Sequence, residues 1–348
     1  MSATENKKID LKEAEEWYDK NKDINKFFCE EMHKLVERVI SSEDLQVHSV
    51  TSRVKEKDSF LKKYEDKKYE SIDKMTDVIG VRVITQILVD VDKVCKLIEK
   101  GFDIDRENSV NKTKKLKEHE VGYQSVHYVL KLNATRLSLP ENKSFADKVF
   151  EIQIRTLLQH AWAENEHDNG YKFAGELPSK IKREFYLIAA TLELMDMEFQ
   201  KLADELDKYK EKTSQEIKEN KLNIEINSTS LIEYLSEKFK DFDNLKKNLN
   251  GKDSEVIQEL KDFGINTIAE LGQHITDSFI DKFKYYDGGN YLGLLRVLMI
   301  TSDINKYFGK CLKEEWTYCP KNFYSFMQTH YPDIDIDSII NKYKLKII

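Results

Sequence analysis

Cysteine, arginine and long apolar runs are all scarce in this 348-residue chain. The four cysteines, at positions 29, 95, 311 and 319, lack the spacing of a metal or redox motif, which predicts a reducing cytosol. No apolar run is long enough to cross a membrane, and the polar, acidic N-terminus lacks the pattern of a secretory signal. We therefore expect a cytoplasmic protein without membrane contact.

The charge balance argues against a protein that coats nucleic acid without sequence preference. The formal net charge is −7, so we expect no DNA partner, although local basic patches remain compatible with it. Only 8 of the 56 basic residues are arginine. Because lysine can supply surface charge, each arginine is a candidate for fork-shaped recognition of an anion.

Hydrophobic residues make up 40% of the chain, enough to bury a core, and the length suits two domains or one domain with a helical appendage. Residues 11–41 have helical periodicity, which predicts two consecutive helices. The first 175 residues mix strand-like and helix-like segments, which predicts an α/β or α+β sheet domain. Its strands are expected at 48–54, 78–88, 125–132 and 149–155, and its further helices at 90–100, 156–171 and 178–212.

The character of the chain changes after about residue 222. A short strand is expected at 223–227, and the rest is helical with short breaks. Residues 256–271 predict a helix–turn–helix hairpin, in which Gly264 ends the first helix and Asn266 or Thr267 caps the second.

The most informative run is residues 150–156, a buried strand that leads at once into a helix. Ile152 and Ile154 face one side of the pleat, whereas Glu151, Gln153 and Arg155 face the other. The pattern also fits an edge strand with a solvated face. A carboxylate, an amide and a guanidinium together can instead hold a metal-bound polyphosphate.

A second segment places Asp77 at the head of a strand that contains Gly80 and Arg82. Active sites of open sheets gather at such an edge, and a glycine within a strand leaves room for a ligand. Asp77 and Arg82 share a side only if the chain turns or bulges near Asp77. Taken alone, Asp77 would be a turn residue.

A third segment contains Arg53, Lys55, Ser59 and Lys63, which could wrap a triphosphate. The alternative is a solvated, lysine-rich helix.

A fourth segment presents Tyr123, Ser125 and His127 on one face of a strand that follows Gly122. A tyrosine ring there can stack on a nucleobase. The alternative is that the ring and the histidine only pack within the sheet.

In order along the chain, these four segments resemble the synthetase domain of RelA/SpoT-type (p)ppGpp synthetases, in particular small alarmone synthetases, over about residues 45–175. The motifs that carry the resemblance are Arg-x-Lys…Ser…Lys, Asp-x-x-Gly-x-Arg, Gly-Tyr-Gln-Ser-x-His and Glu-Ile-Gln-Ile-Arg-Thr…Ala-x-x-Glu. The resemblance implies an α+β fold with a nucleotidyltransferase-like mixed β-sheet flanked by helices, followed by an all-α C-terminal region. The domains expected are N-terminal helices (1–45), the synthetase domain (46–215) and a regulatory or oligomerisation region (216–348).

The resemblance also implies a role for each candidate residue. Asp77 and Glu151 would be catalytic and would ligate Mg²⁺, with Glu151 as ligand or as the base for the 3′-hydroxyl. The ATP-binding residues would be Arg53, Lys55, Ser59, Lys63 and Arg82. The residues around the acceptor nucleotide would be Tyr123, His127, Gln153 and Arg155.

The implied enzyme is a GTP diphosphokinase, encoded by a bacterium or a phage, that transfers pyrophosphate from ATP to the 3′-OH of GDP or GTP in alarmone synthesis and the stringent response. One departure concerns the acceptor: His119-Glu120-Val121 stands where the family pattern has Lys-Pro-Asn before Gly-Tyr. The alternatives are therefore a toxic synthetase acting on tRNA 3′ ends or adenine nucleotides, and a nucleotide-binding regulatory protein without catalysis. Homo-oligomerisation is left open.

Overall fold

The computed structural model describes residues 11–43, 45–67, 69, 71–111, 125–172, 178–243, 245–249, 251–286, 289–311 and 318–348. The chain forms two compact units, Met1–Ala203 and Asp204–Ile348, which we call the N-terminal and C-terminal units. The boundary falls inside one helix, α6 (Ser179–Lys218). The division at residues 45 and 215 that the sequence suggested stays a prediction.

The N-terminal unit is built on a five-stranded mixed sheet, so the expected α+β fold class is confirmed. The strand order is β1-β2-β5-β4-β3, and only β2 and β5 run parallel. The strands are β1 (Ser49–Val54), β2 (Ile79–Thr85), β3 (Phe102–Asn111), β4 (Val126–Leu132) and β5 (Phe150–Thr156). The other elements of this unit are α1 (Leu11–Ser41), α2 (Lys57–Lys67), η1 (Ile72–Lys74), α3 (Leu88–Gly101), α4 (Ala134–Leu137), η3 (Pro140–Phe145), α5 (Leu157–Lys172) and part of α6.

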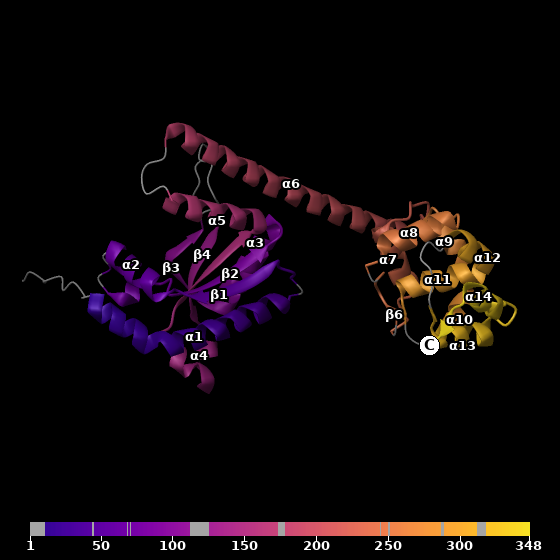
Figure 1. Ribbon diagram of the computed structural model, residues 1–348, viewed down its shortest axis with the longest axis horizontal. Helices are drawn as coiled ribbons and strands as arrows, with labels where there is room; N and C mark the ends of the chain where they lie inside the picture. The colour runs from indigo at the N-terminus through magenta and orange to yellow at the C-terminus, as the bar shows by residue number, and fades with distance from the viewer. Residues whose placement is uncertain are drawn as a thin grey trace, which may run out of the picture. The chain divides into compact units, whose positions relative to one another are not determined.

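One face of the sheet carries the core of this unit. Val81 and Val83 of β2 and Ile152 and Ile154 of β5 are buried there with apolar residues of α1 and α3. Figure 1 shows α1 crossing this side of the sheet, while α5 and the first part of α6 lie on the other side. Because side chains alternate along a strand, the neighbours of these valines and isoleucines must face away from the core.

The prediction of two helices in residues 11–41 was wrong, because α1 is one continuous helix. No glycine or proline interrupts this segment. Asn21 and Asn25, which could have marked a break, instead lie on one side of the helix, where both side-chain oxygens accept hydrogen bonds from Lys148 Nζ at 3.0 and 2.9 Å.

The C-terminal unit is helical, with two minor pairs of two-residue strands. Its own apolar core includes Leu231, Leu260, Leu294 and Leu298. After the end of α6 its elements are α7 (Ser228–Lys238), β6 (Leu245–Lys246), α8 (Asp253–Asp262), α9 (Ile268–His274), α10 (Asp277–Phe283), β7 (Gly289–Asn290), α11 (Tyr291–Ser302), α12 (Ile304–Lys306), the π-helix η4 (Tyr307–Cys311), β8 (Tyr318–Cys319), α13 (Lys321–His330), α14 (Ile336–Tyr343) and β9 (Lys346–Ile347).

The predicted hairpin in residues 256–271 is confirmed. Gly264 has a φ of +81° and follows the end of α8, a left-handed conformation that glycine adopts easily. Thr267 caps α9 and forms a capping box with Glu270. The strand expected at 223–227 is reduced to a single bridge between Glu225 and Thr267. Among the described residues, no helix combines the length and the apolarity that crossing a bilayer requires.

Candidate active site

The face of the sheet opposite the core carries two rows of candidate residues. The first row crosses three strands as Arg53, Gly80 and Glu151, which are register partners. The second row crosses four strands as Thr51, Arg82, Gln153 and His127. Residues two apart on one strand face the same side, so strand register alone brings these side chains together.

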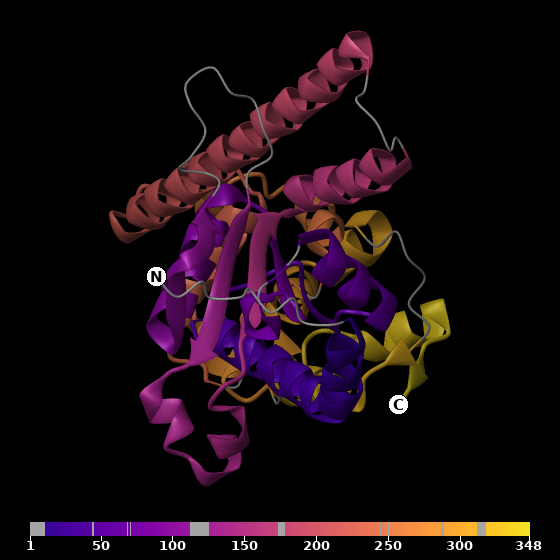
Figure 2. The same ribbon diagram turned by 90° about the vertical axis from the view of Figure 1, so that its left-hand side faces the viewer.

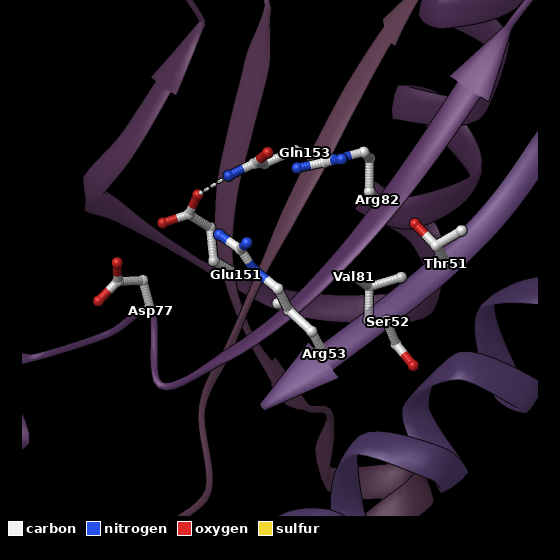
Figure 3. A pocket seen from close by; sticks show the side chains of 9 residues that line it. Thr51, Ser52, Arg53, Asp77, Val81, Arg82, Glu151 and Gln153 are labelled. Carbon is white, nitrogen blue, oxygen red and sulfur yellow. Dashed lines mark hydrogen bonds between the residues drawn. The ribbon is translucent and has the colours of Figure 1, made fainter. Parts of the chain in front are cut away.

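A pocket of about 140 Å³ lies over these rows (Figure 3). It is lined by Thr51, Ser52, Arg53, Asp77, Gly80, Val81, Arg82, Glu151 and Gln153. Two carboxylates and two guanidinium groups therefore meet in one concavity. That combination suits an anionic ligand that also carries a divalent cation.

Asp77 reaches the pocket from the turn just before β2, which is the turn that its position relative to Arg82 required. Its Oδ2 contacts Lys63 Nζ at 2.5 Å and Lys55 Nζ at 3.1 Å. Burial acts to raise the pKa of Asp77, but the two ammonium groups outweigh burial and hold that pKa below its ordinary value. The carboxyl is therefore ionised.

Glu151 projects from the start of β5 and is held by two neighbours on the same face. Its Oε1 accepts a hydrogen bond from Gln153 Nε2 at 2.8 Å and lies 3.1 Å from His127 Nδ1. Burial acts to raise the pKa of Glu151, but His127 and Gln153 hold it below its ordinary value. His127 Nε2 in turn lies 2.7 Å from Ser125 Oγ, so two polar side chains, one from β4 and one from the residue just before it, support the carboxylate.

The pair of carboxylates fits a magnesium ion. Asp77 Oδ1 is buried and has no hydrogen-bond partner among the described residues. Asp77 and Glu151 both line the pocket, and the charge of Asp77 acts to raise the pKa of Glu151. Mg²⁺ is commonly held by one or two carboxylates together with substrate phosphates. Within the described part of the chain no larger cluster of His, Cys, Asp or Glu has metal-binding geometry.

Glu164 of α5 joins the arginines of the site, and its role was missed in the sequence. Its Oε1 lies 3.1 Å from Arg82 Nη1, 3.7 Å from Arg155 Nη2 and 3.5 Å from His160 Nδ1. Arg155 is buried, so water compensates little of its charge, and the carboxylate of Glu164 contributes to that compensation. The helical spacing of His160 and Glu164 was visible, but nothing in it indicated which strand the helix would cover.

The remaining predicted residues are distributed as follows. Arg53 lines the pocket from β1, whereas Lys55 and Lys63 do not line it but contact Asp77, which does. Ser59 is exposed on α2, one turn before Lys63, and does not line the pocket. Tyr123 lies outside the described residues. Thr51 and Ser52 line the pocket without having been predicted, although Thr51 shares a face with Arg53 and could have been found by alternation.

Comparison with known proteins places this site in a family. Residues 52–176 match the family model described as a region found in RelA / SpoT proteins. The chain is 30% identical over 165 residues to GTP pyrophosphokinase YjbM of Bacillus subtilis, an alignment that covers 46% of this chain and 74% of YjbM. It is 25% identical over 171 residues to GTP pyrophosphokinase YwaC of the same organism, covering 46% of this chain and 76% of YwaC.

Among solved structures, the crystal structure of the small alarmone synthetase 1 from Bacillus subtilis is 26% identical. The superposition covers 56% of this chain and 99% of the synthetase chain, with a TM-score of 0.46. The matched family region contains every residue of the pocket except Thr51.

Proposed function

Because the chain belongs to the RelA/SpoT family of nucleotide pyrophosphokinases, we propose that it transfers the pyrophosphoryl group of ATP to the 3′-hydroxyl of GDP or GTP. The observation that carries the proposal is the meeting of Asp77 and Glu151 with Arg53 and Arg82 around one pocket. A protein that only bound nucleotide would need the positively charged arginine side chains but not two ionised carboxylates.

ATP is bound through its phosphates. Arg53 and Arg82 present forked donors to them, and Lys55 and Lys63 supply compact charge. Bound Mg²⁺ would be held by Asp77 and Glu151 and would neutralise charge on the phosphates. Lys55 and Lys63 both contact Asp77 Oδ2, so their ammonium groups lie next to a carboxylate that lines the pocket.

The transfer itself needs a nucleophile and a base. The 3′-oxygen of the acceptor bonds to the β-phosphorus of ATP. The bond from that phosphorus to the oxygen that bridges the α- and β-phosphates breaks, and AMP leaves with that oxygen. The hydroxyl proton goes to the carboxylate of Glu151, whose position His127 and Gln153 fix. Arg155 and Tyr123 complete the acceptor side of this proposal.

The decisive experiment supplies the protein with Mg²⁺, ATP labelled at the γ-phosphate and one acceptor at a time. The acceptors are GDP, GTP, AMP and tRNA. We expect label on GDP or GTP and an equal amount of AMP. Label on tRNA or on AMP as acceptor would instead establish one of the other acceptor classes.

Two variants make the experiment specific. Glu151→Gln is expected to lower transfer by about 10²–10⁴-fold, the usual contribution of a positioned base. ATP binding, measured without Mg²⁺ because Glu151 would also hold the cation, should be at least as tight as in the parent. Glu141→Gln, an exposed glutamate on η3, serves as the matched control and should transfer normally. Absence of transfer to every acceptor, with unchanged nucleotide binding in Glu151→Gln, would leave a non-catalytic nucleotide-binding protein.

A further inference from the structure

The carboxylate of Glu164 connects helix α5 to two arginine side chains of the sheet. Its Oε1 lies 3.1 Å from Arg82 Nη1 and 3.7 Å from Arg155 Nη2. The arginines belong to neighbouring strands, β2 and β5, and both project from the face that carries the site. Figure 2 shows α5 on the side of the sheet opposite α1. A helix above the sheet thus supplies one carboxylate oxygen to two guanidinium groups.

The two arginines have different surroundings. Arg155 is only 4% exposed, whereas the side chain of Arg82 is 24% exposed and, unlike Arg155, lines the pocket. Figure 3 shows the Arg82 side chain extending across the sheet toward Gln153, its register partner on β5. The buried arginine therefore anchors the Glu164 carboxylate from below, and the carboxylate contacts the guanidinium that reaches the pocket.

His160 lies beside the same carboxylate on α5, one helical turn earlier. Its Nδ1 is 3.5 Å from Glu164 Oε1. Burial and the charges of Arg155 and Arg82 lower the pKa of the His160 ring, so the ring is neutral at pH 7. Two guanidinium charges against one carboxylate then leave a net positive charge. The group can therefore still attract a polyphosphate.

The contact between Glu164 and Arg82 affects orientation more than stability. Glu164 is 56% exposed, and ion pairs that water reaches add little to the free energy of unfolding. A long arginine side chain, however, loses rotamer freedom when it binds a ligand. An arginine that is already held in its binding orientation loses less of that freedom on binding, which favours affinity.

We propose that Glu164 is a positioning residue for Arg82 and holds its guanidinium in the orientation that binds ATP. The proposal rests on the ATP binding that the proposed function assigns to this pocket. Charge alone predicts the opposite effect, because the carboxylate of Glu164 repels phosphate and its removal would tighten ATP binding. The sign of the change in affinity therefore decides between positioning and charge repulsion.

The test measures binding of an ATP analogue by calorimetric titration of the full chain in the presence of Mg²⁺. A methylene group replaces the oxygen between the α- and β-phosphates of the analogue, so transfer cannot occur. We expect Glu164→Ala to weaken binding by about three- to tenfold, the usual effect of ordering one long side chain. Glu164→Gln, which keeps an oxygen for Arg82, should weaken binding less. Asn165→Ala, an exposed position next to Glu164, is the control and should bind as the parent does.

A second pair of variants separates positioning from a general disturbance of the fold. Arg82→Ala should itself weaken binding of the analogue. In that background Glu164→Ala should change the affinity by less than about 1.5-fold, because a positioning residue has no effect once the residue that it positions is absent. Equal losses in the two backgrounds would overturn the proposal, and so would tighter binding by Glu164→Ala alone.

These outcomes are separate from those of the transfer experiment. Binding of the analogue through Arg82, without transfer to any acceptor, would overturn the proposed function but leave the role of Glu164 in place. Unchanged binding by Arg82→Ala would overturn the role of Glu164, whether or not the protein transfers pyrophosphate. Thermal unfolding identifies variants that do not fold, and Glu164→Gln replaces Glu164→Ala in both backgrounds if the alanine variant is one of them.

Discussion

At the scale of single residues, both carboxyl groups of the site are held in their charged form by their neighbours. The pKa values of Asp77 and Glu151 both lie below their ordinary values, in spite of burial. A lowered pKa makes a carboxylate a weaker base, but it keeps that carboxylate ionised, the form that can hold a divalent cation or accept a proton. The histidine and glutamine beside Glu151 therefore keep its carboxylate ionised and fix its orientation.

A buried carboxyl outside the site gives a pH-dependent prediction. Asp196 is buried, its Oδ2 accepts a hydrogen bond from Thr156 Oγ1 at 2.7 Å, and burial raises its pKa above 3.8. The neutral form therefore stabilises the fold, and that stability is lost as pH rises from 3.8 through the folded-state pKa. Asp196→Asn, neutral at every pH, should remove this decrease in the free energy of unfolding.

Urea unfolding at a series of pH values checks the prediction. Asp207→Asn, which removes an exposed carboxylate from the same helix, serves as the control and should retain the decrease. Parallel pH profiles for the parent and Asp196→Asn would show that Asp196 does not titrate in this range.

At the scale of elements, the parallel pair β2–β5 forms the floor of the pocket, and Gly80 is its only position without a side chain. A Cβ added to Gly80 meets no atom within 4 Å, because the space above it belongs to the pocket. Gly80→Val should therefore leave stability within about 1 kcal/mol of the parent, since valine suits a strand. The same side chain would occupy much of the 140 Å³ that the ligand needs.

We expect Gly80→Val to weaken ATP binding by about tenfold or more, and Gly80→Ala to weaken it less. Calorimetric titration with ATP and Mg²⁺ measures both, and thermal unfolding verifies the fold. Unaltered ATP affinity in the valine variant would mean that the nucleotide binds elsewhere on the sheet.

The elements that the sequence predicted well are those with a clear period and a clear end. The strand at 149–155 alternates cleanly, and the observed strand β5 is shifted by one residue. β3 was missed because its apolar alternation stops after Phe102 and Ile104 and gives way to the polar run from Asp105 to Ser109, which is held by pairing with β4. Candidate residues of the site could be named from motifs, but Glu164 could not be connected to Arg82, because that contact depends on how α5 packs.

At the scale of the whole molecule, the chain contains two separate apolar cores, one in each unit. The C-terminal core encloses an ionic network. Arg296 contacts the buried Glu259 through two hydrogen bonds, at 3.1 and 2.5 Å, and Tyr307 Oη donates to the same carboxylate at 3.1 Å. Removal of one partner of a buried pair costs about 3–5 kcal/mol, because the other charge stays buried.

Arg296→Met is therefore expected to destabilise the C-terminal unit selectively. Calorimetry should show two unfolding transitions in the parent, one of which rises when ATP and Mg²⁺ are added. The variant should lower only the transition that does not respond to ATP. The double variant Glu259→Gln/Arg296→Met should recover part of the loss, whereas a single transition in the parent would contradict the independence of the two cores.

The order in which the site's strands leave the ribosome has a consequence for synthesis. β1 and β2 pair between residues 49 and 85, but β5, which carries Glu151, ends at residue 156. Parallel pairing across so long a stretch of chain forms slowly compared with local structure. A nascent chain therefore exposes Asp77 and Arg82 well before their partner strand exists, and translation must pass β5 before the polypeptide can bind nucleotide at this site.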